Sequence, residues 1–118
     1  MKYALLIYTD PNGGPADGSP EQMAEMQKWF GYSQEAGDAG VLLGGEGLQG
    51  TETATSVKVQ DGNTITADGP FAETKELLGG FYLLDLPDMD AAIAWAEKIP
   101  SVGYGTVEIR PVMEYPTD

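Results

Sequence analysis

Residues 3–8, Tyr-Ala-Leu-Leu-Ile-Tyr, decide the fold, because every position in this stretch is apolar or aromatic. Successive side chains of a strand point to opposite faces, so residues 3, 5 and 7 share one face and residues 4, 6 and 8 share the other. Both faces of such a strand need an apolar cover. Residues 81–86, Phe-Tyr-Leu-Leu-Asp-Leu, have the same character and predict a second strand of this kind.

Two helices are expected beside these strands. Residues 19–22, Ser-Pro-Glu-Gln, supply an N-cap, a first-turn proline and a capping-box glutamine, and predict a helix that ends near residues 37–40. The predicted buried stripe of this helix consists of Met23, Met26, Phe30 and Ser33. Asp88 is the predicted N-cap of a second helix that Pro100 ends. The predicted buried face of the second helix consists of Met89, Ala92, Ile93, Ala96 and Ile99.

The remaining strands are shorter. Residues 41–43 predict a strand that runs into a glycine-rich segment, residues 44–47, where a ligand could approach the backbone. Residues 56–60 alternate polar and apolar, and Asp61-Gly62 predicts a hairpin turn before residues 63–67 return. Residues 106–110 predict the last strand. The order of elements predicts an α+β, ferredoxin-like βαββαβ fold with an extra hairpin strand.

In that fold the helices cover one face of the antiparallel sheet and leave the other face bare. With 118 residues the chain forms one domain, residues 1–118, and has no second layer of its own to cover this face. A second copy of the same sheet is the simplest cover. The sequence therefore predicts a homodimer with facing sheets.

Composition excludes several functional classes. A formal charge of −13 opposes binding to nucleic acid, and the scattered lysines form no basic surface for a membrane. The chain has no histidine and no cysteine, which removes the commonest general base, thiolate nucleophiles and the usual zinc ligands. No cofactor is predicted. The N-terminal apolar run is short and lacks a cleavage pattern, so a cytoplasmic protein is expected.

Residues 68–76, Asp-Gly-Pro-Phe-Ala-Glu-Thr-Lys-Glu, combine a chain reversal, an aromatic residue and several ionisable side chains. In one-letter code they read DGPFAETKE, and on this motif the chain resembles the DGPFAETKE proteins of the YCII-related superfamily. Residues 44–48, 79–82 and 105–112 also resemble family patterns, so the resemblance spans nearly the whole chain.

The resemblance implies a dimeric α+β barrel and a biochemical role that is largely undefined. It also implies a genomic association of relatives with extracytoplasmic-function sigma factors, which is the basis for naming some of them transcription-initiation proteins. A histidine and aspartate pair has been proposed as catalytic in the superfamily. That chemistry does not transfer to a chain without histidine.

Two carboxylates are the candidate catalytic residues. Asp68 either points into a cleft or accepts backbone N–H bonds in a turn before Gly69, and turn chemistry favours the second role. Glu46 has no turn or helix-pattern reason to lie within a glycine run, so it is the stronger functional candidate, although an exposed loop carboxylate explains it equally well. With Glu73 these acids would be the oxygen ligands of a metal, but their spacing does not predict a metal site.

The remaining candidates are ligand-binding residues. Phe71 either lines an apolar pocket or fills the core, and Glu73 and Lys75 either bind a polar ligand or form a solvated charged face. Arg110 is the only arginine of the chain. It either clamps a carboxylate or phosphate, or pairs with Glu108 of a neighbouring chain or another acid, and the second alternative is favoured.

Tyr8 and Tyr82, on the doubly apolar strands, either present hydroxyl groups to a cavity or pack in an interface. Two functional hypotheses follow. The first is a small-molecule site, binding or catalytic, for a polar metabolite, in a pocket lined by these residues. The second is a non-enzymatic regulatory module whose acidic surface meets a basic partner such as a sigma factor.

Overall fold

The computed structural model describes residues 1–70 and 74–116. The elements run in the order β1 (Lys2–Thr9), α1 (Pro20–Asp38), β2 (Leu42–Gly47), a short 3-10 helix η1 (Thr51–Thr53), β3 (Thr55–Gln60), β4 (Asn63–Asp68), β5 (Leu77–Asp85), α2 (Met89–Glu97) and β6 (Gly105–Pro111).

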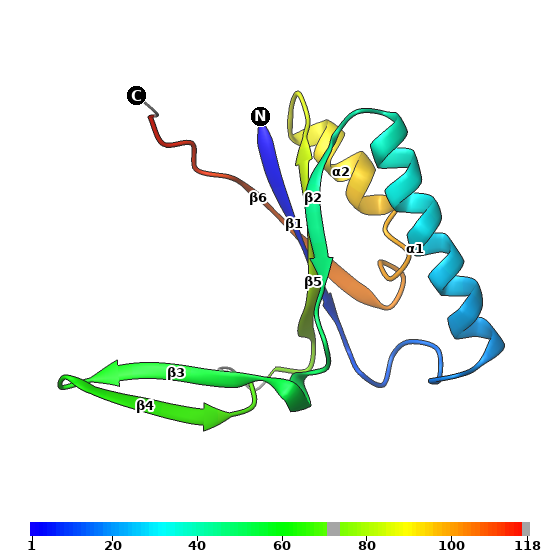
Figure 1. The fold of residues 1–118 in the computed structure, drawn as a ribbon. Coiled ribbons are helices and arrows are strands. Elements are labelled where there is room, and N and C mark those ends of the chain that lie inside the picture. The colour runs from blue at the N-terminus through cyan, green and yellow to red at the C-terminus, as the bar shows by residue number, and fades with distance from the viewer. Residues whose placement is uncertain (71–73, 117–118) are drawn as a thin grey trace.

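The main sheet is antiparallel and has the strand order β2-β5-β1-β6. The doubly apolar strands β1 and β5 are its two central strands, as expected for segments that need cover on both faces. Figure 1 shows α1 and α2 packed together on one side of this sheet. The predicted α+β, ferredoxin-like arrangement is therefore confirmed.

The core lies between this sheet and the helices. Leu5 and Leu84 from the central strands are fully buried, and Ala36, Ala92 and Ile99 meet them from the helical layer. The small alanines let the helix backbones approach the sheet, so the large side chains of the strands fill the space between the layers.

Helix α1 begins as predicted. Ser19 caps it, because the Ser19 hydroxyl accepts a hydrogen bond from the Gln22 backbone N–H at 3.1 Å. The Gln22 side-chain oxygen accepts from the N–H of Gly18 at 2.6 Å, one residue before the N-cap. The Ala39 C-cap and Gly40, with φ of 73°, end the helix where the glycines predicted.

The predicted buried stripe of α1 is wrong for its three apolar residues, whereas Ser33 is half-buried and faces the sheet. Met23 and Phe30 are 66% and 63% exposed, and Met26 is exposed as well. Tyr32 and Ala36 are buried instead. Both stripes have helical spacing, and aromatic packing decides between them, because Tyr32 contacts Tyr82 of β5 and Trp95 of α2.

Helix α2 agrees more closely with prediction. Asp88 caps it, since its carboxylate accepts a hydrogen bond from the Ala91 N–H at 2.9 Å. Of the predicted buried face, Ala92, Ala96 and Ile99 are buried, whereas the flanking Met89 and Ile93 are exposed. The buried face is narrower than predicted because α2 contacts the sheet through its alanines.

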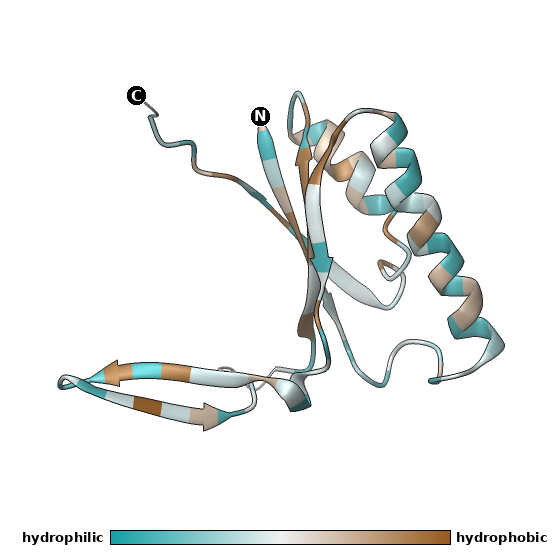
Figure 2. Cartoon of the chain, viewed as in Figure 1, coloured by the Kyte–Doolittle hydropathy of each residue, from teal (hydrophilic) through white to brown (hydrophobic). Residues whose placement is uncertain are grey.

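The β3–β4 hairpin forms a separate two-stranded sheet that projects away from the body, as Figure 1 shows. Asp61 and Gly62 form its turn with φ of 52° and 78°, which confirms the predicted hairpin turn. Figure 2 shows apolar bands along this arm, and Val59 is 70% exposed. A two-stranded hairpin is only marginally stable by itself. Its exposed apolar side chains are unusual for an arm that is surrounded by solvent.

The glycine-rich segment, residues 44–47, continues the strand predicted for residues 41–43, and together they form the edge strand β2. Glycine is needed because the strands approach closely: a Cβ on Gly45 would lie 2.6 Å from the Phe81 carbonyl oxygen, and one on Gly80 would lie 2.8 Å from that of Glu46. The missing side chains therefore allow β2 to pair with β5.

The sheet face opposite the helices carries a line of apolar side chains. In the register of β1 with β5, Leu6 lies opposite Phe81 and Ala4 opposite Leu83, on the face away from the buried Leu5. This face is partly exposed in the single chain, and the facing-sheet homodimer stays a prediction. Neither helix in the described residues is long and apolar enough to cross a bilayer.

Candidate ligand-binding cavity

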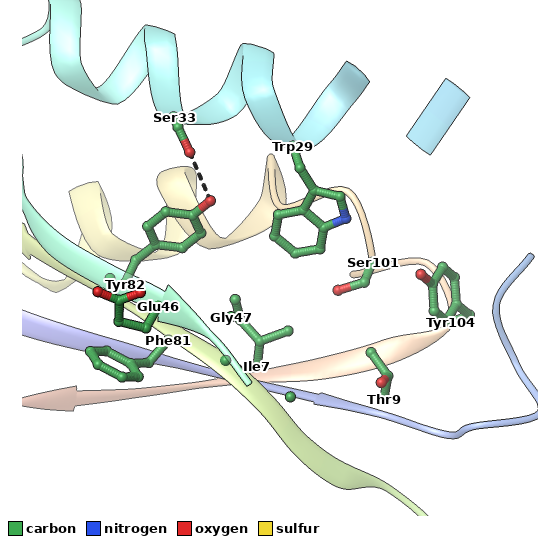
Figure 3. A pocket seen from close by; sticks show the side chains of 13 residues that line it. Ile7, Thr9, Trp29, Ser33, Glu46, Gly47, Phe81, Tyr82, Ser101 and Tyr104 are labelled. Carbon is green, nitrogen blue, oxygen red and sulfur yellow. Dashed lines mark hydrogen bonds between the residues drawn. The ribbon is translucent and has the colours of Figure 1, made fainter. Parts of the chain in front are cut away.

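A cavity of about 440 Å³ lies between α1 and the main sheet. The edge strand β2 borders it, and Figure 3 shows the side chains that line it. The cavity is lined by Ile7, Thr9, Trp29, Ser33, Gly45, Glu46, Gly47, Gly79, Gly80, Phe81, Tyr82, Ser101 and Tyr104. It has the size of a small-molecule site.

Aromatic rings form one wall of the cavity. Trp29 of α1 and Tyr82 of β5 are nearly parallel, with ring centroids 6.4 Å apart and an angle of 18° between the planes. The Tyr82 hydroxyl shares a 2.9 Å hydrogen bond with the Ser33 hydroxyl, drawn in Figure 3. This bond fixes the ring against α1, so the wall is formed before any ligand enters.

Tyr32 supports this wall from the core. Its ring lies 5.0 Å from that of Tyr82, and its hydroxyl donates a 3.0 Å hydrogen bond to the Trp95 carbonyl oxygen. Burial is the main cause that raises the pKa of the Tyr32 hydroxyl above its usual range, and the nearby Tyr82 and Glu35 raise it further. Tyr32 therefore remains a neutral, fixed support for Tyr82.

Ser101 supplies an unpaired polar group. It follows α2, is 2% exposed, and its hydroxyl has no hydrogen-bond partner among the described residues. Figure 3 shows the oxygen directed towards the side where Trp29 and Ile7 lie. A buried hydroxyl without a partner costs about 1–3 kcal/mol, which a polar ligand atom in the cavity would offset.

Tyr104 closes one end of the cavity. Its hydroxyl donates a 2.5 Å hydrogen bond to Glu25 of α1, and its ring packs on Gly14, where an added Cβ would lie 3.0 Å from a ring carbon. Burial is the main cause that raises the pKa of the Tyr104 hydroxyl, and the hydrogen bond to Glu25 raises it further. The contacts hold the loop before α1, the helix and the start of β6 together.

Glycine leaves the cavity open on the side of β2. Gly47 of β2 pairs with Gly80 of β5, and Gly80 pairs with Ile7 of β1. Paired residues share a face of the sheet, and Ile7 faces the helices. A side chain at position 47 would therefore point into the cavity. A Cβ there would meet no heavy atom within 4 Å. Position 47 is therefore a place where a larger residue would fill the cavity without disturbing the sheet.

The structure places two predicted site residues at this cavity. Tyr82 presents its hydroxyl on the α1 side. Glu46 lies at the edge of the cavity and is exposed. The register pairs Glu46 with Phe81, which lies opposite Leu6, so the Glu46 side chain leaves the strand on the face away from the helices.

Tyr8 and Lys75 lie at a second, more open hollow of about 720 Å³. Lys75 is 87% exposed and lies 3.9 Å from a carboxylate oxygen of Asp10. In the same hollow, Thr106 donates a 2.9 Å hydrogen bond to the Glu76 carboxylate. Such exposed charge pairs contribute little to stability.

Arg110 and Asp68 line neither hollow. Arg110 pairs with Glu108, two residues earlier on β6 of the same chain, at 3.0 Å. Asp68 is exposed at the end of β4, opposite Thr55. Phe71 and Glu73 lie outside the described residues. The described candidates therefore do not converge on one pocket.

Trp29, Ser101 and Tyr104 are cavity residues that sequence reasoning missed. Trp29 had a usable signal, because Trp29, Tyr32 and Ala36 also follow helical spacing. Ser101 and Tyr104 follow the second helix in an irregular segment, and no local pattern brings them to α1. In residues 1–70 and 74–116, no cluster of three or more acidic side chains could hold a metal ion.

Comparison with known proteins assigns the family. The family model of the YCII-related domain matches residues 1–116. An uncharacterized protein of Rhizobium meliloti (strain 1021) is 35% identical over 117 residues, which cover 98% of this chain and 94% of that protein. Both matches span nearly the whole fold, including every strand around the cavity. This protein belongs to the YCII-related family.

Proposed function

We propose that this protein is a small-molecule-binding domain whose site is the cavity beneath α1. The observation that carries the proposal is the Ser101 hydroxyl, which is buried and unpaired among the described residues at the wall of an aromatic cavity. A few polar groups within an apolar concave site are typical of ligand recognition. The Ser33 and Tyr82 hydroxyls add a second polar point.

The proposal concerns binding. A role for Glu46 as general acid or base is a separate and narrower prediction. The Glu46 side chain leaves β2 on the face opposite the cavity wall formed by Trp29. Asp68 lies on the separate hairpin sheet and enters no step of this proposal. Turnover that is lost in Glu46→Gln while folding is retained would extend the proposal to catalysis.

A pair of variants at Gly47 tests the binding proposal. Gly47→Leu adds a side chain that fills the cavity, whereas Gly47→Ala makes the same backbone change and leaves most of the space empty. A thermal-shift screen of metabolites against the wild-type protein identifies stabilising compounds, because binding to the native state raises apparent stability.

Compounds that occupy the cavity stabilise the wild-type protein and Gly47→Ala but not Gly47→Leu. If Gly47→Leu folds and responds to every hit as Gly47→Ala does, the ligand site lies elsewhere and the proposal is wrong.

We also propose that the protein is a homodimer in which the bare sheet faces pack together. The apolar line through Ala4, Leu6, Phe81 and Leu83 supports this, because a partly exposed apolar sheet face is stabilised by a second layer. Sedimentation of the intact chain at micromolar concentration tests it.

A second candidate function is regulation through a basic protein partner such as a sigma factor. The observation that favours it is the exposed apolar stripe Met23, Met26 and Phe30 on α1, in a chain with a formal charge of −13. An exposed apolar stripe on a strongly acidic protein suits a basic amphipathic partner segment. Salt-sensitive co-purification that is lost in a Met26→Asp, Phe30→Asp double variant would support it, and no complex at low ionic strength would refute it.

A further inference from the structure

We infer that the cavity beneath α1 selects small organic cations that carry an apolar or aromatic body, and that it rejects anions. This inference rests on the proposed small-molecule site and names its ligand class. Three observations support it: the aromatic walls, the sign of the charges around the cavity, and the placement of the buried hydroxyl.

The first observation is the set of aromatic rings at the cavity. Trp29, Tyr82 and Tyr104 all line it, and the first two are held nearly parallel. The negative face of an aromatic ring attracts an ammonium group, and a cage of several rings is a recurring way to bind alkylated ammonium ligands. The Ser33 hydrogen bond fixes Tyr82, so the cage requires little reorganisation.

The second observation is charge. None of the described lining residues is a lysine or arginine, so the cavity wall offers no cation to pair with a phosphate or carboxylate ligand. Carboxylates lie around it instead: Glu46 is at its edge, and Glu25 accepts the hydrogen bond of Tyr104. With a formal charge of −13 on the whole chain, the field at the cavity opposes anions and attracts cations.

The third observation is the arrangement of polar atoms. The Ser101 oxygen can accept a hydrogen bond from an N–H group, and it lies on the wall that also carries Trp29 and Ile7. A ligand with an ammonium group near Ser101 and an apolar body against Ile7 would satisfy both surfaces. A volume of about 440 Å³ accommodates a molecule with a single ring.

Three probes with the same ring separate charge from shape: benzylammonium, benzyl alcohol and benzoate. The protein has two tryptophans, and replacing Trp95, which does not line the cavity, by phenylalanine leaves Trp29 as the fluorescent reporter. Titrations at constant ionic strength then give three dissociation constants for the cavity. Benzylammonium is expected to bind about threefold to tenfold more tightly than benzyl alcohol, with benzoate weakest.

Variants of the cage provide the structural check. In Trp29→Leu, followed by ligand-observed NMR, the preference for benzylammonium over benzyl alcohol is expected to fall, because the Trp29 ring is lost while Tyr82, Tyr104 and the surrounding carboxylates remain, whereas Trp29→Phe retains a ring at this position and most of the preference. Because both variants keep an apolar residue at position 29, a purely structural role of Trp29 would not change the ratio of the two affinities. An unchanged ratio in Trp29→Leu overturns the assignment of the cage.

The outcomes also separate this inference from the proposed function. If benzoate or benzyl alcohol binds as tightly as benzylammonium, cation selectivity is wrong but the cavity remains a binding site. If none of the probes binds, cation selectivity is again wrong. The proposed function fails only if, in the broader screen, no compound distinguishes Gly47→Leu from Gly47→Ala.

Discussion

The Tyr104 hydroxyl donates a 2.5 Å hydrogen bond to Glu25, and so joins the segment before β6 to α1 across 79 positions of the sequence. This contact closes one end of the cavity. Its loss would free the loop that packs on the Tyr104 ring as well as the helix, so Tyr104 links the stability of the fold to the shape of the site.

Replacing Tyr104 by phenylalanine is expected to lower the free energy of unfolding by about 1–2 kcal/mol, because a hydrogen bond to a charged group is lost while the ring packing remains. Urea denaturation followed by circular dichroism measures the change. Glu25→Gln keeps an acceptor and should cost less. Equal costs for both variants would show that the Glu25 charge, rather than the bond itself, stabilises the contact.

The same hydroxyl predicts a dependence on pH. Its pKa is raised in the folded protein, so its contribution to stability is present below the unfolded value of about 10 and is lost as the pH rises through the folded pKa. We expect the wild-type protein to lose its stability advantage over Tyr104→Phe above about pH 10. Tyr32 also has a raised pKa and is present in both proteins, so the difference between them isolates Tyr104. A constant difference between pH 7 and pH 11 would contradict the prediction.

Ser101→Ala is expected to leave stability unchanged or to raise it by about 1 kcal/mol, because the change removes a buried hydroxyl that lacks a partner. Ser56→Ala is the matched control, since the Ser56 hydroxyl donates a 2.8 Å hydrogen bond to the Gly69 carbonyl oxygen. Guanidinium denaturation compares the two variants. A loss of more than about 1 kcal/mol in Ser101→Ala would mean that this hydroxyl is paired in solution.

Gly80→Ala is expected to destabilise the protein by about 1–3 kcal/mol, because the new methyl group would approach the Glu46 carbonyl oxygen to 2.8 Å and force β2 away from β5. Gly47→Ala, on the strand opposite, meets open space and should change stability by less than about 0.5 kcal/mol. Thermal unfolding of both variants measures the difference. Similar melting temperatures would show that β2 moves without cost.

Leu6→Asp is expected to convert the proposed dimer to a monomer, because it places a charge in the middle of the bare sheet face, beside Phe81. Met23→Asp adds the same charge to the exposed surface of α1 and should leave the dimer intact. Sedimentation velocity distinguishes the two states. A monomeric wild-type protein would remove the basis of this prediction and of the facing-sheet assembly.

Local chemistry was sufficient to predict the frame of this fold. Ser19 and Asp88 cap their helices, Asp61 and Gly62 form a tight turn, and the doubly apolar strands take the centre of the sheet. Each of these features depends on neighbouring residues or on simple alternation, which a sequence displays directly.

The orientation of α1 and the composition of the cavity depend on distant contacts. Helix α1 has two stripes with helical spacing, and only the packing of Tyr32 against Tyr82 and Trp95 decides which one faces the core. Ser101 and Tyr104 reach the cavity because of the path taken after α2. The close approach of β2 and β5, which requires Gly45 and Gly80, also depends on strands that are distant in the sequence.

The β3–β4 arm has a consequence for how this protein opens. Within residues 1–70 and 74–116, neither β3 nor β4 pairs with a strand of the main sheet, so the backbone amides of the arm can exchange with solvent without global unfolding. In hydrogen-exchange experiments on an isolated chain, amides of the arm should lose protection first and those of β1 last. A protease should likewise cut the arm while the rest of the domain stays intact, and slow exchange there would reveal that a neighbouring molecule shelters it.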